Sequence, residues 1–205
     1  MQKRSAVSRT KRIALLAIML ALIVLMSFIP LNISGATFAF TLLPVMVLAL
    51  TQDFLTGLLG GVVMGVSSLV MAFTVSAGSP TAPIFQNPLI SVLPRIIVPV
   101  AGFAVMKALS ALAKSVNRDK EDYLVPKGWQ AAIDGTAALA GVLTNTGLVL
   151  GLMWAVYGGR TVGETLVSPE FMTAMISVNF VVEAVAIPLL TAPVTYAIRK
   201  SATHS

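Results

Sequence analysis

The amino-acid sequence predicts an all-α membrane protein with six transmembrane helices in a single integral membrane domain, residues 1–205. Of these residues, 57% are hydrophobic and only 11% are charged, whereas about 25% are charged in an ordinary soluble domain. The apolar residues form long continuous runs and lack the short alternating pattern of a transmembrane β-barrel. Because so much apolar surface cannot be hidden within a soluble protein of this size, the lipid bilayer is the expected solvent.

Helix breakers and charged residues set the boundaries of the six apolar segments. Pro30 ends the first, and the second contains Pro44 and is short enough to be tilted, kinked or only partly spanning. The third is rich in glycine, with overlapping GxxxG patterns at Gly57, Gly61 and Gly65 that favour close packing against a neighbouring helix. The predicted helices cover approximately residues 13–29, 39–50, 54–75, 89–113, 129–157 and 169–198.

The distribution of basic residues predicts that both termini are cytoplasmic. Five basic residues precede the first helix, four lie in the segment 114–128, and two follow the last helix, whereas the predicted outer loops contain only Arg160. Positive residues collect in the cytoplasmic loops of membrane proteins. The net charge of +6 is therefore explained by membrane topology, and we expect no nucleic-acid partner.

Several classes of catalytic site are missing from the sequence. There is no cysteine, and the single histidine, His204, lies in a polar tail, which removes thiol nucleophiles, thiolate metal sites and histidine pairs. No Walker-type phosphate loop and no HExxH zinc motif is present. We therefore expect no catalytic residues, no metal, no cofactor and no enzymatic activity in this chain.

The stretch Gly78–Arg95 interrupts the hydrophobic pattern and then carries a charge into it. Its three prolines prevent a regular helix through the first half, and Gln86 and Asn87 add side-chain amides. Arg95 follows inside an apolar span, where an ionisable residue by default marks a functional site. We assign Gln86, Asn87, Ser91 and Arg95 to one wall of a small-molecule site.

Further polar residues lie within the last two predicted helices. Asn179 and Glu183 are four residues apart and therefore share one helix face. Asn145 lies at a comparable depth in the fifth helix, below Trp154 near its outer end. Polar groups from three helices at compatible depth predict one cavity that opens to the outside.

The same residues also have purely structural interpretations. A buried arginine and glutamate can form an ion pair between helices, and buried asparagines can hydrogen-bond across helices. Tryptophan and tyrosine near the membrane surface can anchor a helix in the interface, and side-chain amides beside prolines can form turns. Both interpretations stay open for Arg95 with Glu183, Asn145 with Asn179, Trp154 with Tyr157, and Gln86 with Asn87.

Two segments carry a resemblance to a known family. The first helix contains Ala17-Ile-Met-Leu-Ala21, and the loop and the start of the fourth helix read Phe85-Gln-Asn-Pro-Leu-Ile-Ser-Val-Leu-Pro-Arg95. With its six predicted helices, the chain resembles the substrate-binding S-component of an energy-coupling factor (ECF) vitamin transporter. It is most similar to the pantothenate-specific members, and the acidic motif of the riboflavin members is absent from Phe40–Pro44.

The resemblance implies a multi-pass protein of the bacterial cell membrane that binds a vitamin from outside. Such a protein would then topple against a transmembrane coupling subunit and release the vitamin inside, while two separate cytoplasmic ATPase subunits would hydrolyse ATP. Ala17 and Ala21 would form the docking groove for the coupling subunit, since small residues four apart allow close helix packing. The loop before the fourth helix would gate the pocket.

For pantothenate, the resemblance assigns a role to each polar residue. Arg95 would pair with the carboxylate, and Glu183 would orient Arg95 or accept a hydrogen bond from a hydroxyl. Trp154 would cover the gem-dimethyl group. The amide and hydroxyls would be served by Asn87, Asn145 and Asn179. The alternatives are another vitamin (folate, a pyridoxine-type compound or cobalamin) and a structural membrane subunit or small channel without a high-affinity ligand.

Overall fold

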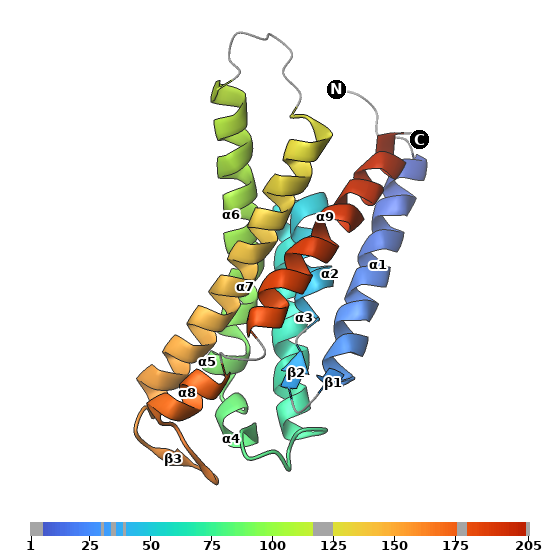
Figure 1. Ribbon diagram of the computed structural model, residues 1–205. Coiled ribbons are helices and arrows are strands. Elements are labelled where there is room, and N and C mark those ends of the chain that lie inside the picture. Colours follow the sequence, from blue (N-terminus) through green and yellow to red (C-terminus); the bar gives the residue numbers. More distant parts are fainter. Residues whose placement is uncertain are drawn as a thin grey trace.

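The computed structural model describes residues 6–29, 31–33, 36–38, 40–116, 125–175 and 180–203, and they form a helical bundle (Figure 1). Five helices in these ranges are long and apolar enough to cross a membrane. They are α1 (Ala6–Phe28), α3 (Phe54–Phe73), α6 (Leu93–Val116), α7 (Lys127–Tyr157) and α9 (Val181–Thr203). The shorter helices are α2 (Leu42–Thr51), α4 (Ala82–Phe85), α5 (Pro88–Ser91) and α8 (Pro169–Met175).

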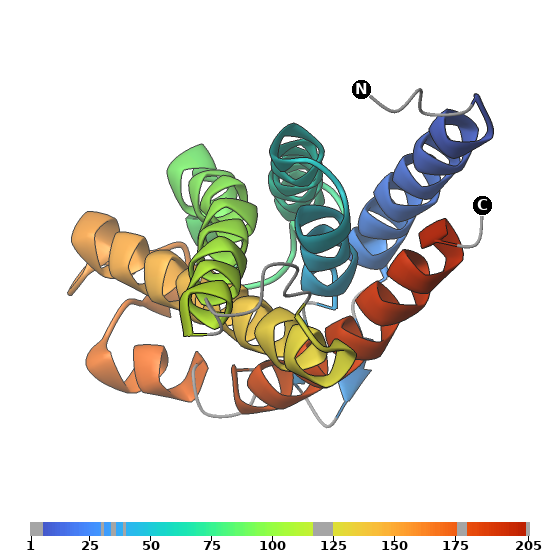
Figure 2. The same cartoon turned by 90° about the horizontal axis from the view of Figure 1, so that it is seen from above.

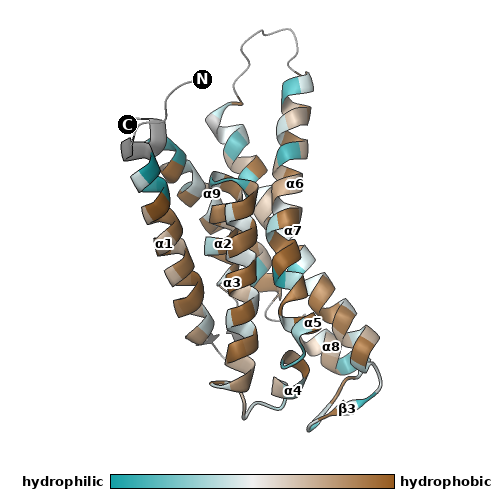
Figure 3. Cartoon of the chain, turned by 180° about the vertical axis from the view of Figure 1, so that it is seen from behind, coloured by the Kyte–Doolittle hydropathy of each residue, from teal (hydrophilic) through white to brown (hydrophobic). Residues whose placement is uncertain are grey.

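The prediction of an all-α membrane protein is confirmed in class, but the second predicted helix is not a full span. At ten residues, α2 is about 15 Å long, roughly half the thickness of the hydrocarbon core. The hydropathy colouring of Figure 3 shows hydrophobic residues along the middle of the long helices, with hydrophilic residues gathered where α1 begins and α9 ends. The described residues thus combine five helices of spanning length with the shorter apolar helix α2.

The short helix α2 is the centre of the bundle. Leu42, Val45, Met46 and Leu48 are completely buried, and α2 contacts each of α1, α3, α6, α7 and α9 (Figure 2). A helix that is hydrophobic all round is buried all round. These residues form the main apolar cluster together with Ile23, Met64, Val98, Ala137, Val142 and Ile187.

One end of the bundle, which we call the basic end, is where α1 and α7 begin and α6 and α9 end (Figure 1). Two networks of side-chain hydrogen bonds and ion pairs hold this end together. Arg12 on α1 donates to Gln52 (3.1 Å) and Asp53 (3.0 Å) in the turn between α2 and α3. Asp53 also caps α3, and a hydrogen bond from the Thr56 side chain, assisted by Arg12, holds the pKa of Asp53 below its ordinary value.

The second network at the basic end contains a buried carboxylate. Asp134 on α7 is only 1% exposed and accepts hydrogen bonds from Gln130 (3.0 Å), Thr195 (2.7 Å) and Arg199. Arg199 also donates to the carbonyl of Leu50 at 2.8 Å, at the last turn of α2. This network joins α2, α7 and α9, and its shared carboxylate compensates the charge that Arg199 brings to the end of α2.

The other end, which we call the cavity end, is formed by short elements. The strands β3 (Thr161–Val162) and β4 (Thr165–Leu166) pair as an antiparallel hairpin, as do β1 (Leu31–Ile33) and β2 (Ala36–Phe38). Thr165 donates to the carbonyl of Pro80 at 2.8 Å, which fastens the β3–β4 hairpin to the loop before α4. A second apolar cluster lies here and consists of Ile84, Ile90, Val149, Met153 and Val167.

Two predicted helices are divided in the structure. The fourth, predicted over 89–113, consists of α5 and α6, because Pro94 has no N–H to continue α5 and instead sits in the first turn of α6. The sixth, predicted over 169–198, is represented by α8 and α9, and residues 176–179 lie outside the described residues. Both divisions are at the cavity end, so several short segments end there in place of continuous helices.

Close packing of α3 on α6 fixes the position of Arg95. A Cβ atom added to Gly61 would lie 2.5 Å from the carbonyl oxygen of Arg95 and 2.9 Å from Cγ of Pro99. Only a residue without a side chain fits this approach, so the GxxxG pattern in the third helix does mark a packed face. The backbone of Arg95 is therefore held against α3.

Substitution of Gly61 by alanine should destabilise the protein by about 1–3 kcal/mol, because the added methyl group forces α3 and α6 apart. Gly147→Ala on α7 is the matched control, since no atom lies within 4 Å of the added Cβ. Denaturant unfolding of the purified proteins in detergent measures both changes. Equal stability of the Gly61 and Gly147 variants would contradict a tight α3–α6 contact.

Candidate functional site

A cavity of about 440 Å³ lies between the two apolar clusters. Met64 of the main cluster and Val149 of the second cluster both line it. Thr41, which immediately precedes α2, contributes from the basic side, and Ser76, Ser79 and Thr81 contribute from the loop at the cavity end. The volume falls within the range of roughly 300–1,000 Å³ that is usual for small-molecule sites.

Arg95 is the cation of this cavity, and its guanidinium is held from two sides. It is 9% exposed, donates from Nη1 to the carbonyl of Ile90 at 2.7 Å, and lies 5.9 Å from the ring centroid of Phe85. The buried Nε has no hydrogen-bond partner. A donor left unpaired on an otherwise fixed guanidinium is ready to receive an acceptor from a ligand.

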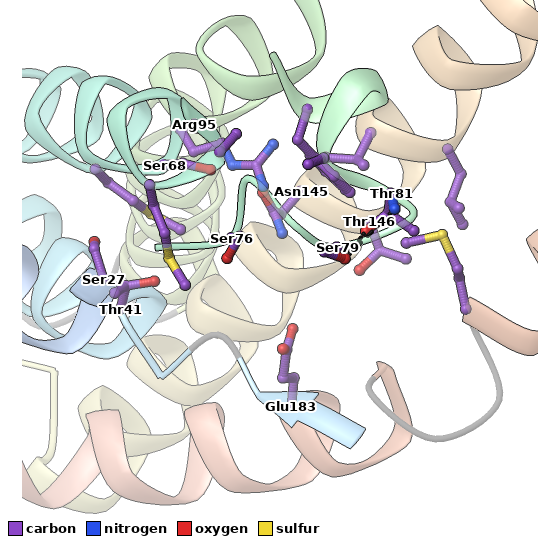
Figure 4. Close-up of a pocket in the computed structure, with 18 of the residues that line it drawn as sticks. Ser27, Thr41, Ser68, Ser76, Ser79, Thr81, Arg95, Asn145, Thr146 and Glu183 are labelled. Atoms are coloured by element: carbon purple, nitrogen blue, oxygen red, sulfur yellow. Dashed lines mark hydrogen bonds between the residues drawn. The ribbon is translucent and has the colours of Figure 1, made fainter. Parts of the chain in front are cut away.

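Asn145 and Glu183 face the same space (Figure 4). Asn145 on α7 is 7% exposed, and its buried Oδ1 has no hydrogen-bond partner. Glu183 on α9 is 6% exposed and points into the cavity from the side opposite Arg95 and Asn145. Its carboxylate attracts the Arg95 guanidinium electrostatically. The predicted convergence of polar groups from three helices therefore holds for these three residues.

The polar wall between these groups consists mainly of hydroxyls, which the sequence prediction missed. A serine or threonine in an apolar helix gives little signal, because its hydroxyl often bonds to the carbonyl one turn earlier. Thr146 beside Asn145 offered the clearest hint, since three adjacent polar residues, Thr144, Asn145 and Thr146, interrupt the apolar run of α7. The hydroxyl-bearing residues of the lining are Ser27, Thr41, Ser68, Ser76, Ser79, Thr81 and Thr146.

The apolar part of the wall is made of flexible and aromatic side chains. Methionine side chains adapt to irregular shapes, and four of them line the cavity beside two phenylalanines. The residues are Met26, Met64, Met71, Met175, Phe85 and Phe180.

Two predicted site residues, Gln86 and Asn87, do not line the cavity and instead tie elements together. Gln86 donates to the carbonyl of Ala72 at 3.1 Å, at the end of α3. Asn87 accepts from the backbone N–H of Leu89 at 3.0 Å as the N-cap of α5, and donates to the hydroxyl of Tyr157 at 3.1 Å. Both residues thus act as turn formers and cross-links at the cavity end.

Among the described residues, Ser91 and Trp154 are also not part of the cavity lining. Ser91 is completely buried and donates to the carbonyl of Phe85. Trp154 is 48% exposed, and its ring packs beside Gly158 at the end of α7. The assignment of Trp154 to the apolar part of a ligand is therefore replaced by the methionine and phenylalanine wall. Asn179 lies outside the described residues.

The arrangement suits a small amphiphilic ligand. It offers a cation and an amide oxygen on one side and an anion on the other, and hydroxyls and apolar side chains complete the wall. Because Arg95, Asn145 and Glu183 are buried between apolar clusters, each polar contact that they make is stronger than it would be in water. Binding and orientation of a ligand are the chemistry that this set of residues can perform.

The fold and the site together define a class of protein: an all-α membrane protein with a polar small-molecule cavity at one end of its helical bundle. No protein-family model matches the chain, and no curated protein matches it either.

The electrostatic coupling of Arg95 to Glu183 can be measured without a ligand. Arg95→Met leaves a buried carboxylate without its attracting cation, Glu183→Gln does the converse, and the double variant removes both charges. We expect the double variant to lose less stability than the sum of the single variants, by about 0.5–3 kcal/mol in denaturant unfolding. As a control, the stability losses of Arg95→Met and of Glu170→Gln on exposed α8 should add up in the double variant. Additive losses for Arg95→Met and Glu183→Gln would contradict the coupling.

Proposed function

We propose that this protein is the substrate-binding S-component of an ECF-type vitamin importer and that its cavity binds pantothenate. The observation that carries the proposal is the cavity with an unpaired buried donor on Arg95 and an unpaired buried acceptor on Asn145. Buried polar groups are normally paired. Their pairing in a bound ligand explains why both groups are kept in an apolar bundle.

The chemistry of pantothenate matches the cavity group by group. Its carboxylate pairs with Nε of Arg95, whose guanidinium is already held by the carbonyl of Ile90 and the ring of Phe85. An amide or hydroxyl of the ligand donates to Oδ1 of Asn145, and a hydroxyl donates to Glu183. The gem-dimethyl group packs on the methionine and phenylalanine wall.

The charge distribution gives the orientation that uptake requires. The basic end carries Arg9, Lys11, Arg12, Lys114, Arg199 and Lys200, whereas Arg160 lies at the cavity end. By the positive-inside rule, the basic end and both termini face the cytoplasm of the bacterial cell. The cavity then faces outwards and captures the vitamin from the external medium.

The transport step needs partners. In the proposed importer, the loaded protein topples in the membrane against a transmembrane coupling subunit, and two cytoplasmic ATPase subunits supply the energy. Ala17 and Ala21 are exposed on α1, where two small side chains four residues apart leave room for a partner helix. This chain itself performs no catalysis in the proposal.

Removal of the Arg95 side chain should abolish the capture of pantothenate. Arg95→Ala leaves the ligand carboxylate buried without its partner, so we expect the affinity to fall by at least about 100-fold. Isothermal titration of the purified protein with pantothenate measures this loss. Arg160→Ala, which removes an exposed cation at the same end, should bind like the wild type.

Two results would contradict the proposal in different ways. Near wild-type affinity of Arg95→Ala would show that Arg95 does not bind the carboxylate. A wild-type protein that no pantothenate concentration stabilises against heat would show that pantothenate is not its ligand. In that case, mass spectrometry of small molecules that co-purify with the protein identifies the ligand that is bound instead.

Enlargement of the side chains in the α1 groove should separate docking from ligand binding. Ala17→Leu or Ala21→Leu should prevent co-purification with the coupling subunit, because the added side chain blocks close helix contact, and pantothenate affinity should stay unchanged. The matched control is Ala104→Leu or Ala108→Leu, since these exposed alanines have the same spacing on α6. Wild-type co-purification of the α1 variants, with loss only in the α6 variants, would assign docking to α6.

A further inference from the structure

The cavity holds charges of both signs, and they lie on opposite sides of it. Arg95 and Asn145 stand on one side, and Glu183 points in from α9 on the other (Figure 4). Among the described lining residues, Arg95 and Glu183 are the only two that carry a charge. A ligand that places its carboxylate on Arg95 therefore presents its opposite end to a carboxylate.

The carboxylate of Glu183 distinguishes between ligand groups by their charge. A hydroxyl donates a hydrogen bond to it, and a hydrogen bond to an ionised acceptor is among the stronger ones. An anionic group at the same place meets a like charge at 6% exposure, where water screens the repulsion poorly. Like-charge juxtaposition in such a setting is strongly unfavourable.

We propose that Glu183 is a specificity-determining residue that selects pantothenate through its terminal hydroxyl and rejects the same molecule once that hydroxyl carries a phosphate. The inference rests on the proposed function and deepens it, because it narrows the ligand to a hydroxylated monoanion. Phosphorylation adds a charge of about −1.5 to −2, at the end of the ligand that meets Glu183. The importer would then take up the free vitamin and leave its phosphorylated form outside.

One feature of the cavity acts in the opposite direction. Thr41 lines the cavity at the start of α2, and the first turn of a helix attracts anions. If this end of α2 received the phosphate, the phosphorylated ligand would bind well despite Glu183. A comparison of the two ligands therefore decides between the two effects.

The test uses the full-length protein in detergent and two ligands, pantothenate and its terminal phosphate ester. For the wild type, titration calorimetry should show that the phosphate ester binds at least about 100-fold more weakly. Glu183→Gln should weaken pantothenate roughly tenfold, because the acceptor loses its charge, and should reduce the preference for pantothenate to below about tenfold. Glu170→Gln removes a carboxylate on exposed α8 and should retain the wild-type preference.

The variants distinguish charge from shape. Glu183→Asp keeps the negative charge and should keep the preference, even where the shorter side chain lowers the affinity for pantothenate. Glu183→Ser provides a second neutral variant should Glu183→Gln fail to give a monodisperse protein, and it too should lose the preference. An unchanged preference in a folded neutral variant would overturn the role of Glu183.

The outcome for the wild type separates this inference from the proposed function. Tight binding of both ligands would overturn the inference and leave the proposed pantothenate site intact. Binding of neither ligand would overturn the proposed function, and the inference with it. Preference for pantothenate that is lost in the neutral variants and kept in Glu183→Asp is the result that we expect.

Discussion

The length of α2 is the constraint on which the rest of the structure depends. Its ten residues cover about 15 Å, half of what a membrane-spanning helix needs. Because α2 contacts all five long helices and is buried on every side, it forms the core of the bundle at the basic end. The cavity lies beyond Thr41, in the part of the bundle that α2 is too short to fill. A full-length helix in this place would fill the bundle and remove the site.

The long helices and the central residues of the site could be predicted from the sequence, because polar residues stand out within the long apolar runs of a membrane protein. A continuous apolar run of spanning length identifies α3, which was expected over 54–75 and is observed over Phe54–Phe73. Placing an arginine, an asparagine or a glutamate inside such a run costs free energy, so each of these residues indicates a functional or structural role. Arg95, Asn145 and Glu183 were found in this way, and the structure brings them to one cavity.

The other contacts could not be predicted, because they join residues that lie far apart in the sequence. Gln86 and Asn87 lie beside prolines, where an amide can equally face a ligand or cap a helix, and the structure shows that they hold α3, α5 and α7 together. The buried network of Asp134 could not be predicted, because its partner Arg199 is 65 residues away in the sequence. The hydroxyls of the cavity wall come from separate stretches of the chain, from Ser27 to Thr146, so no local motif contains them.

In the proposed importer, the way in which Arg95 is held links occupancy of the cavity to the order of its cap, which we define as the short helices α4 and α5. The guanidinium is fixed by the carbonyl of Ile90 on α5 and the ring of Phe85 on α4. Phe85 belongs to the loop that was expected to gate the pocket, and Ile90 to the first turn of the predicted fourth helix. A ligand that pairs with Nε makes it costlier to pull the guanidinium away from these two contacts, and by reciprocity the intact cap favours ligand binding. In this proposal, a cap that closes behind an anion needs no separate sensor, since the residue that would bind the ligand is also the residue that contacts the cap.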